Sequence, residues 1–272
     1  MKLSFTTLAC PDWDLDAILP AARKYGYDAI DFRHYKGSTA LHAMPEFTTG
    51  LADTSRRIAA AGLNVSGISS GIKVLQADPA KREQVVNDAA AYARIAAGLG
   101  APVLRVFGGE LGAMPRPEAV RLGGATLRAM AGAAAPFGVT VALETHDDWT
   151  RGADAAALLD AAGAGTRTGV LWDVLNGWHN TDEQPEQTWK SIRGRVVATH
   201  WKDSSTSYPE KCRYCLHGQG RAPFREFHAL LREGGYDGYY TFEWEKAWHP
   251  ELAAAEISLP AFVQCMRALE KG

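Results

Sequence analysis

Short runs of β-branched and aromatic residues alternate with alanine-rich stretches along the whole chain, and the alternation repeats eight times. The strand-like runs fall near 2–7, 28–34, 64–69, 102–107, 139–145, 168–174, 196–202 and 239–245. The helix-like stretches fall near 14–25, 46–61, 80–99, 116–136, 152–162, 184–193, 223–234 and 254–270. Strands that alternate with helices form parallel sheets with right-handed crossovers. Eight such units favour a closed (β/α)8 barrel over an open sheet, so we predict an α/β TIM barrel.

The length and composition fit one large barrel better than two small domains. The chain has 272 residues, 46% of them hydrophobic, and no linker, low-complexity segment or charge block divides it. A chain of this size buries about three quarters of the surface that it exposes when unfolded. We therefore expect residues 1–272 to form a single TIM-barrel domain.

Four potential metal ligands lie at the ends of four successive strand-like runs in the second half of the chain. They are Glu144 in Val-Ala-Leu-Glu, Asp173 in Leu-Trp-Asp-Val, His200 in Ala-Thr-His-Trp and Glu243 in Thr-Phe-Glu-Trp. A barrel gathers the carboxyl ends of its strands around one axis, so these side chains should meet there. Three carboxylates and one imidazole suit one divalent ion, for which we favour Mn²⁺, with Mg²⁺, Co²⁺ or Zn²⁺ as alternatives.

The alternative is that each carboxylate pairs separately with an arginine or caps a helix. One strand-end carboxylate often does this. Three carboxylates and an imidazole in successive units would each need a separate partner, and lysine and arginine are sparse in these strands. Without a cation, the three carboxylates would repel one another or become protonated.

Further inward side chains follow from strand alternation, because residues two apart share a face. His146 shares the face of Glu144 and Lys202 that of His200, so we predict that both contact the substrate. Arg105, in the fourth run, is a weaker candidate of the same kind. Asp31 and Arg33 alternate in the second run, and Arg33 is likewise a weaker candidate, because an inward arginine could also serve only to neutralise carboxylates of the barrel floor.

The longest irregular segment, residues 204–221, follows the seventh strand-like run. It should overhang the mouth of the barrel, as a lid or as a tolerated surface loop, and we favour the lid. Arg221 at its end is a candidate substrate contact. The segment also contains Cys212 and Cys215 near His217, which we interpret as ordinary thiols because no second Cys-x-x-Cys completes a zinc site.

Composition and charge limit the classes of binding partner that we expect. The net charge is −2 with scattered basic residues, so no nucleic-acid footprint is evident. No apolar run is long enough for a membrane span, and the first residues lack a signal-peptide layout, so we expect a cytoplasmic protein. Tryptophans gather at strand ends and in the loops that follow, and aromatic faces suit the C–H surfaces of sugars, so the expected partner is a small-molecule sugar or polyol. Homo-oligomer formation through the tryptophans near 244–248 is left open.

Several motifs resemble the sugar phosphate isomerase/epimerase family, in the xylose isomerase-like TIM-barrel superfamily. They are Leu-Glu-Thr-His, Leu-Trp-Asp-Val, Thr-His-Trp-Lys-Asp, Gly-Gln-Gly-Arg and Gly-Tyr-Asp-Gly-Tyr-Tyr-Thr-Phe-Glu-Trp-Glu. The resemblance implies that Glu144 and Glu243 both bind the metal and move protons. Two positions depart from the ketose 3-epimerase pattern, since Asn176 replaces a histidine and Gln219 a glutamate. We keep both positions as substrate-binding candidates and expect a related activity on another polyol or keto-sugar.

The predicted function is a metal-dependent isomerase or epimerase of a ketose, keto-polyol or related sugar, working through a metal-stabilised enediolate. Glu144 and Glu243 would be its acid and base. The alternative is a dehydratase or lyase that eliminates a β-substituent from a keto-inositol or 3-keto-glycoside. Endonuclease-like hydrolysis is disfavoured because it would need more histidines and a basic groove. A sugar-binding barrel without catalysis would not require two glutamates on one cation.

Overall fold

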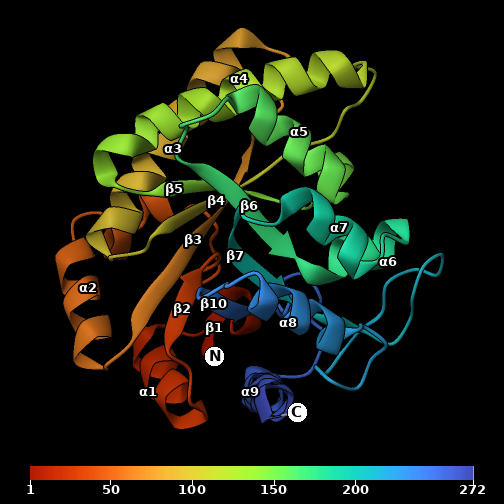
Figure 1. The fold of residues 1–272 in the computed structure, drawn as a ribbon. Coiled ribbons are helices and arrows are strands. Elements are labelled where there is room, and N and C mark those ends of the chain that lie inside the picture. Colours follow the sequence, from red (N-terminus) through yellow and green to blue (C-terminus); the bar gives the residue numbers. More distant parts are fainter. Residues whose placement is uncertain (272) are drawn as a thin grey trace.

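The computed structural model describes residues 1–271, which form a closed parallel barrel surrounded by helices (Figure 1). Within these residues the barrel order is β1-β10-β7-β6-β5-β4-β3-β2. The barrel strands are β1 (Lys2–Thr6), β2 (Ala29–Phe32), β3 (Asn64–Lys73), β4 (Val103–Phe107), β5 (Thr140–Glu144), β6 (Thr168–Asp173), β7 (Val196–Trp201) and β10 (Tyr239–Phe242). The predicted α/β TIM barrel is therefore confirmed.

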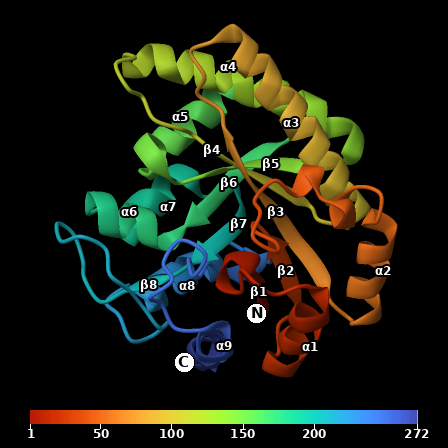
Figure 2. The same cartoon turned by 180° about the vertical axis from the view of Figure 1, so that it is seen from behind.

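The helices cover the outside of the barrel, and Figure 2 shows the same arrangement from behind. They are α1 (Leu15–Tyr25), α2 (Leu51–Ala60), α3 (Pro79–Gly98), α4 (Arg116–Ala134), α5 (Gly152–Ala162), α6 (Val174–Thr181), α7 (Pro185–Ile192), α8 (Phe224–Glu233) and α9 (Ala255–Lys271). Glycines in the left-handed conformation follow several of them, as at Gly26 with φ 86°. No helix within residues 1–271 combines the length and apolarity that a membrane span requires.

Three local features differ from the predicted elements. The helix expected from residue 46 begins at Leu51, because Pro45–Phe47 form a separate 3-10 turn. An additional helix, α6, starts directly after β6. The segment 204–221 contains part of a small antiparallel hairpin, in which β8 (Asp203–Ser204) pairs with β9 (Tyr214–Cys215). This segment therefore contains regular secondary structure, whereas its sequence predicted an irregular loop.

His217 in this segment packs into the aromatic core between the barrel and its outer helices. Its ring lies 4.0 Å from that of Phe224 and 4.7 Å from that of Phe262. Neither ring nitrogen has a hydrogen-bond partner. Burial lowers the pKa of His217 to about 3, because nothing in this apolar setting stabilises the imidazolium.

His217 should therefore make the protein acid-sensitive. Its pKa in the folded protein lies below the unfolded value of about 6.5, so its contribution is complete above that pH and is lost as the pH falls towards 3. At pH 5 the loss should be about 2 kcal/mol. Urea unfolding at pH 7 and pH 5 should show that His217→Phe loses less stability than the wild type by this amount. The exposed control His42→Phe should follow the wild type, and parallel losses in all three proteins would refute the prediction.

Candidate metal centre

The four predicted ligands meet at the carboxyl-terminal end of the barrel. Glu144, Asp173, His200 and Glu243 are buried, and each offers a ligand atom within 4.8 Å of the others. His200 Nδ1 lies 3.4 Å from a Glu144 oxygen and 3.1 Å from a Glu243 oxygen. The strand register accounts for part of this arrangement, because Asp173 on β6 is paired with His200 on β7.

Asp173 serves the fold and the cluster through different oxygens. Its Oδ1 accepts hydrogen bonds from the backbone N–H groups of Leu175 and Asn176, both at 3.0 Å, and so caps α6. Its Oδ2 lies in the cluster, 2.9 Å from Lys202 Nζ. The additional helix α6 is therefore capped by a residue that also belongs to the cluster.

The orientation of His200 is supported from the far side of the barrel. Its Nε2 lies 3.8 Å from an oxygen of Asp31 on β2, so Nδ1 is the nitrogen that faces the cluster. Gly67 on β3 leaves room for Asp31, since a Cβ at that position would lie 2.8 Å from the same carboxylate oxygen. Strand alternation placed Asp31 inward, but only closure of the barrel brings β2 opposite β7.

Lys202 compensates part of the negative charge of the cluster. Its Nζ lies 2.9 Å from Asp173, 2.6 Å from Glu243 and 2.9 Å from Glu245. Burial opposes its charge, yet the surrounding carboxylates, Asp173 first, raise the pKa of Lys202 well above its usual value. Lys202 was predicted to contact substrate, and here its ammonium contacts two of the four candidate ligands.

The pKa values of the acid groups in the cluster shift in different directions. Burial would raise the pKa of Glu144 and of Glu243, but neighbouring cations outweigh it and hold both pKa values below the usual range. Arg105, whose Nε lies 3.1 Å from Glu144 Oε2, is the main cation at Glu144, and Lys202 is the main cation at Glu243. For Asp173, burial prevails over Lys202 and raises the pKa to about 6.

A divalent cation fits this donor set. Several buried atoms of the cluster lack an aligned hydrogen bond, although charged groups lie nearby; they are both Oε atoms of Glu144, Oδ2 of Asp173 and both ring nitrogens of His200. Buried polar atoms are usually satisfied, so their convergence calls for a shared positive partner. Oxygen donors with one imidazole match a hard or borderline ion. The cluster could therefore hold a metal, whose identity the residues do not fix.

The other residues predicted at the mouth are placed differently. His146 is half-buried beside the ring of Phe107, at 4.5 Å, and its Nδ1 lies 2.8 Å from Asp147 Oδ1. The amide nitrogen of Asn176 donates to the Thr145 carbonyl at 3.1 Å. Gln219 is exposed in the turn after β9. His146 therefore lies at the mouth of the barrel, the side chain of Asn176 is bonded to the backbone, and Gln219 lies on the surface.

The Gly-Gln-Gly turn is held by Asp203, whose carboxylate accepts from the N–H groups of Gly218 at 2.9 Å and Gly220 at 2.8 Å. A Cβ on Gly220 would lie 2.1 Å from Asp203, so this turn requires glycine there. The turn geometry thus accounts for the glycines of this motif without involving the side chain of Gln219. Arg221, at the end of the turn, is also exposed.

The rest of the segment contacts the site through Tyr214, whose hydroxyl donates to Glu245 at 2.9 Å. Glu245 in turn accepts from Lys202, which joins the segment to the cluster. Cys212 and Cys215 are free thiols, and burial raises the pKa of both. Within residues 1–271 they form no metal-binding group with His217.

A separate cavity of about 510 Å³ lies at the opposite end of the barrel. The first residues of several strands line it, including Lys2, Val103 and Tyr239. In TIM barrels this face contributes to stability, while catalysis takes place at the carboxyl ends of the strands. The converging titratable side chains therefore locate the candidate site better than cavity size does.

The chain matches the family described as xylose isomerase-like TIM barrel over residues 19–262. Among solved structures, the probable 3-DHS dehydratase AsbF from Bacillus anthracis has a TM-score of 0.81 at 16% identity, covering 98% of this chain and 99% of that chain. The IolI protein with a binding zinc atom has a TM-score of 0.81 at 16% identity, covering 99% and 98%. An L-ribulose 3-epimerase has a TM-score of 0.80 at 17% identity, covering 100% and 95%.

At these identities the solved structures show a shared fold, not a shared reaction. No curated protein matches the sequence significantly. The family match covers most of the chain and agrees with the resemblance of the strand-end motifs. The chain therefore belongs to the xylose isomerase-like TIM barrel family.

Proposed function

We propose that this protein is a divalent-metal-dependent isomerase or epimerase of a ketose, keto-polyol or related sugar. The observation that supports this best is the convergence of Glu144 and Glu243 on one cluster, where one oxygen of each lies within 3.4 Å of His200 Nδ1. Glu144 ends β5 and Glu243 directly follows β10, and β6 and β7 lie between these two strands. Two carboxylates that approach one point from different strands can remove a proton from one side of a carbon and return it to the other.

In this proposal Glu144, Asp173, His200 and Glu243 hold the metal. When bound, the metal polarises the substrate carbonyl and so acidifies the adjacent carbon. One of Glu144 and Glu243 would accept the proton of that carbon, in the ionised form that their lowered pKa values favour. The other, carrying a proton taken up from solvent, would return it to the opposite face and so be left ionised. Lys202, 2.6 Å from Glu243, keeps this carboxylate in place and can donate to a substrate oxygen.

Solvent exchange tests this proposal even before a product has been identified. The purified protein is incubated in D₂O with Mn²⁺ or Co²⁺ and a panel of ketoses and keto-polyols. We expect deuterium at the carbon next to the carbonyl of at least one compound, and NMR identifies that carbon. Exchange should stop when a chelator removes the metal. A panel in which no compound exchanges, with metal bound to the protein, would contradict the proposal.

A second candidate is elimination, in which loss of the same proton expels a β-substituent. The observation in its favour is the His146–Asp147 pair at the mouth, with Nδ1 2.8 Å from Oδ1. A half-buried imidazole that is held by a carboxylate can protonate a departing oxygen. Incubation with keto-inositol or a 3-keto-glycoside should then produce an enone, detected by ultraviolet absorbance. Deuterium incorporation without an enone would reject elimination for these compounds.

A further inference from the structure

Within residues 1–271, Arg33, directly after β2, forms no ion pair, although the charges of Glu243 and Glu144 partly offset the effect of burial on its pKa. It is partly buried, and within residues 1–271 its side chain makes neither a hydrogen bond nor an ion pair. Its Nη1 atom is shielded from solvent and has no partner. Burial, followed by the charge of Arg105, lowers the pKa of Arg33 to about 10. A shielded guanidinium without an acceptor is costly, so its retention calls for a ligand that is absent from the free protein.

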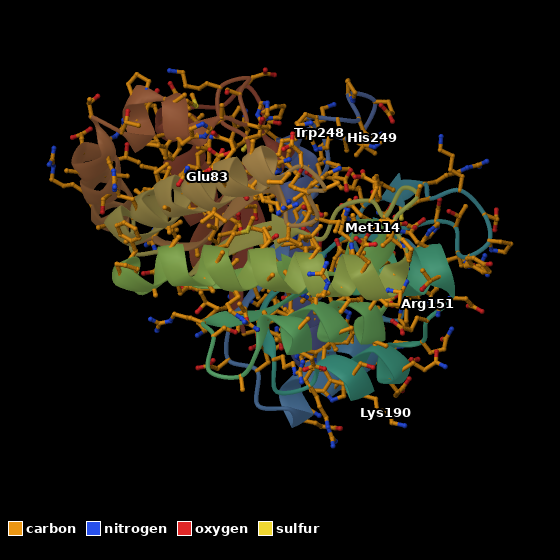
Figure 3. All side chains as sticks on the ribbon, turned by 90° about the horizontal axis from the view of Figure 1, so that it is seen from above. Glu83, Met114, Arg151, Lys190, Trp248 and His249 are labelled. Carbon is orange, nitrogen blue, oxygen red and sulfur yellow. The ribbon has the colours of Figure 1, made fainter. Side chains whose placement is uncertain are left out.

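The neighbouring residues hold Arg33 in position but offer its guanidinium group no hydrogen-bond acceptor. Its guanidinium carbon lies 5.9 Å from the ring centroid of Trp248. The backbone of Gly71 on β3 is also close, because a Cβ there would lie 3.6 Å from Nη2. Figure 3 shows Trp248 and His249 beside each other, and both belong to the segment that follows the carboxyl end of β10. Arg33 is therefore at the mouth, near the metal cluster.

Two further hydrogen-bond donors without partners lie next to Arg33, on the neighbouring strands β3 and β4. On β3, the buried hydroxyl of Ser69 has no partner. Ser69 is paired with Arg105 on β4, and Nη1 of Arg105 also lacks a partner. Asp31 on β2 is paired with Gly67 on β3. When this register is continued by two residues, Arg33 lies level with Ser69. Three adjacent strands thus present unpaired donors in one row.

The row lies on a different part of the mouth from the candidate ligands. β2, β3 and β4 carry the donors, while β5, β6, β7 and β10 carry the metal cluster. Arg105 connects the two halves, because its Nε faces Glu144 while its guanidinium lies 3.9 Å above the Phe107 ring. Two nearby guanidinium groups repel each other unless an anion lies between them. Their planar forks suit the paired oxygens of a carboxylate or phosphate.

We propose that Arg33, Ser69 and Arg105 form an anion-binding subsite, and that the substrate is a polyhydroxy keto compound with a carboxylate or phosphate group. This inference rests on the proposed function for the identity of the reacting part of the molecule. The subsite itself depends only on the three donors. The acid group would bind at β2–β4 and direct the carbonyl end towards the cluster.

The test is calorimetric binding of three compounds with one carbon skeleton: D-ribonate, ribitol 5-phosphate and uncharged ribitol. It is performed with Mn²⁺ and again after chelation, so that metal coordination is separated from the subsite. At least one acid should bind about tenfold more tightly than ribitol in both conditions. The preferred acid distinguishes carboxylate from phosphate.

Arg33→Met should lower the affinity for that acid by about 10- to 100-fold and leave the affinity for ribitol unchanged. Lys36→Met removes an exposed positive charge three residues away and should change neither affinity. The thermal midpoint of Arg33→Met should equal or exceed that of the wild type, because no structural ion pair is lost. Equal binding of acids and ribitol, equal effects of both variants, or a lower midpoint would each overturn the proposal. If the protein binds the acid but exchanges deuterium into none of the keto compounds, the anion-binding subsite stands and the proposed function is rejected.

Discussion

Glu243→Gln is expected to reduce solvent-deuterium exchange into the substrate by about 10³-fold or more. A positioned acid or base contributes about 10²–10⁴-fold, and the amide cannot accept the proton. The substitution keeps the shape of the side chain and an oxygen that can face the cluster. Mn²⁺ binding should therefore be weakened but still measurable by calorimetry.

The matched control is Glu245→Gln, which removes a carboxylate that also pairs with Lys202 at 2.9 Å. Glu245 lies outside the four-residue cluster, so its loss should cost at most about tenfold, as expected for a group that positions Lys202. Exchange by Glu243→Gln at a near-normal rate would remove Glu243 from acid–base catalysis. Equal losses in both variants would assign the effect to the charge around Lys202.

The second large effect is stabilisation by metal. Ions that bind only the folded protein should raise the free energy of unfolding by about 4 kcal/mol at a thousandfold excess over Kd. Asp173→Asn removes one anionic donor while keeping a good helix cap for α6, because asparagine caps as well as aspartate does. At the same Mn²⁺ concentration its stabilisation should fall below about 1 kcal/mol.

Urea unfolding with and without Mn²⁺ measures this difference, and Asp182→Asn is the control. Asp182 is exposed at the carboxyl end of the same helix in the left-handed conformation, with φ 57°, which asparagine tolerates. Its metal response should match the wild type. A full metal response in Asp173→Asn would show that the ion binds without this carboxylate.

Much of the site could be predicted from local patterns. Each candidate ligand ends a strand-like run, and barrels bring such positions together, so the convergence of Glu144 and Glu243 needed no distance information. The partners of Lys202 could not be predicted in the same way. Alternation placed Lys202 on the face of His200, but its contact with Asp173 depends on side-chain reach between neighbouring strands. The aromatic surroundings of His217 were equally inaccessible, because Phe262 comes from the last helix.

Local residue patterns are enough to predict the eightfold alternation, the TIM-barrel fold and the four side chains at the strand ends, because these depend on residues close together in the chain. The tertiary structure decided that Nδ1 of His200 faces the cluster and that Asp31 faces Nε2. It also decided that Arg33 has no acceptor and that the side chain of Gln219 points to the surface. These outcomes depend on closure of the barrel and on register between strands distant in sequence, which local periodicity does not specify.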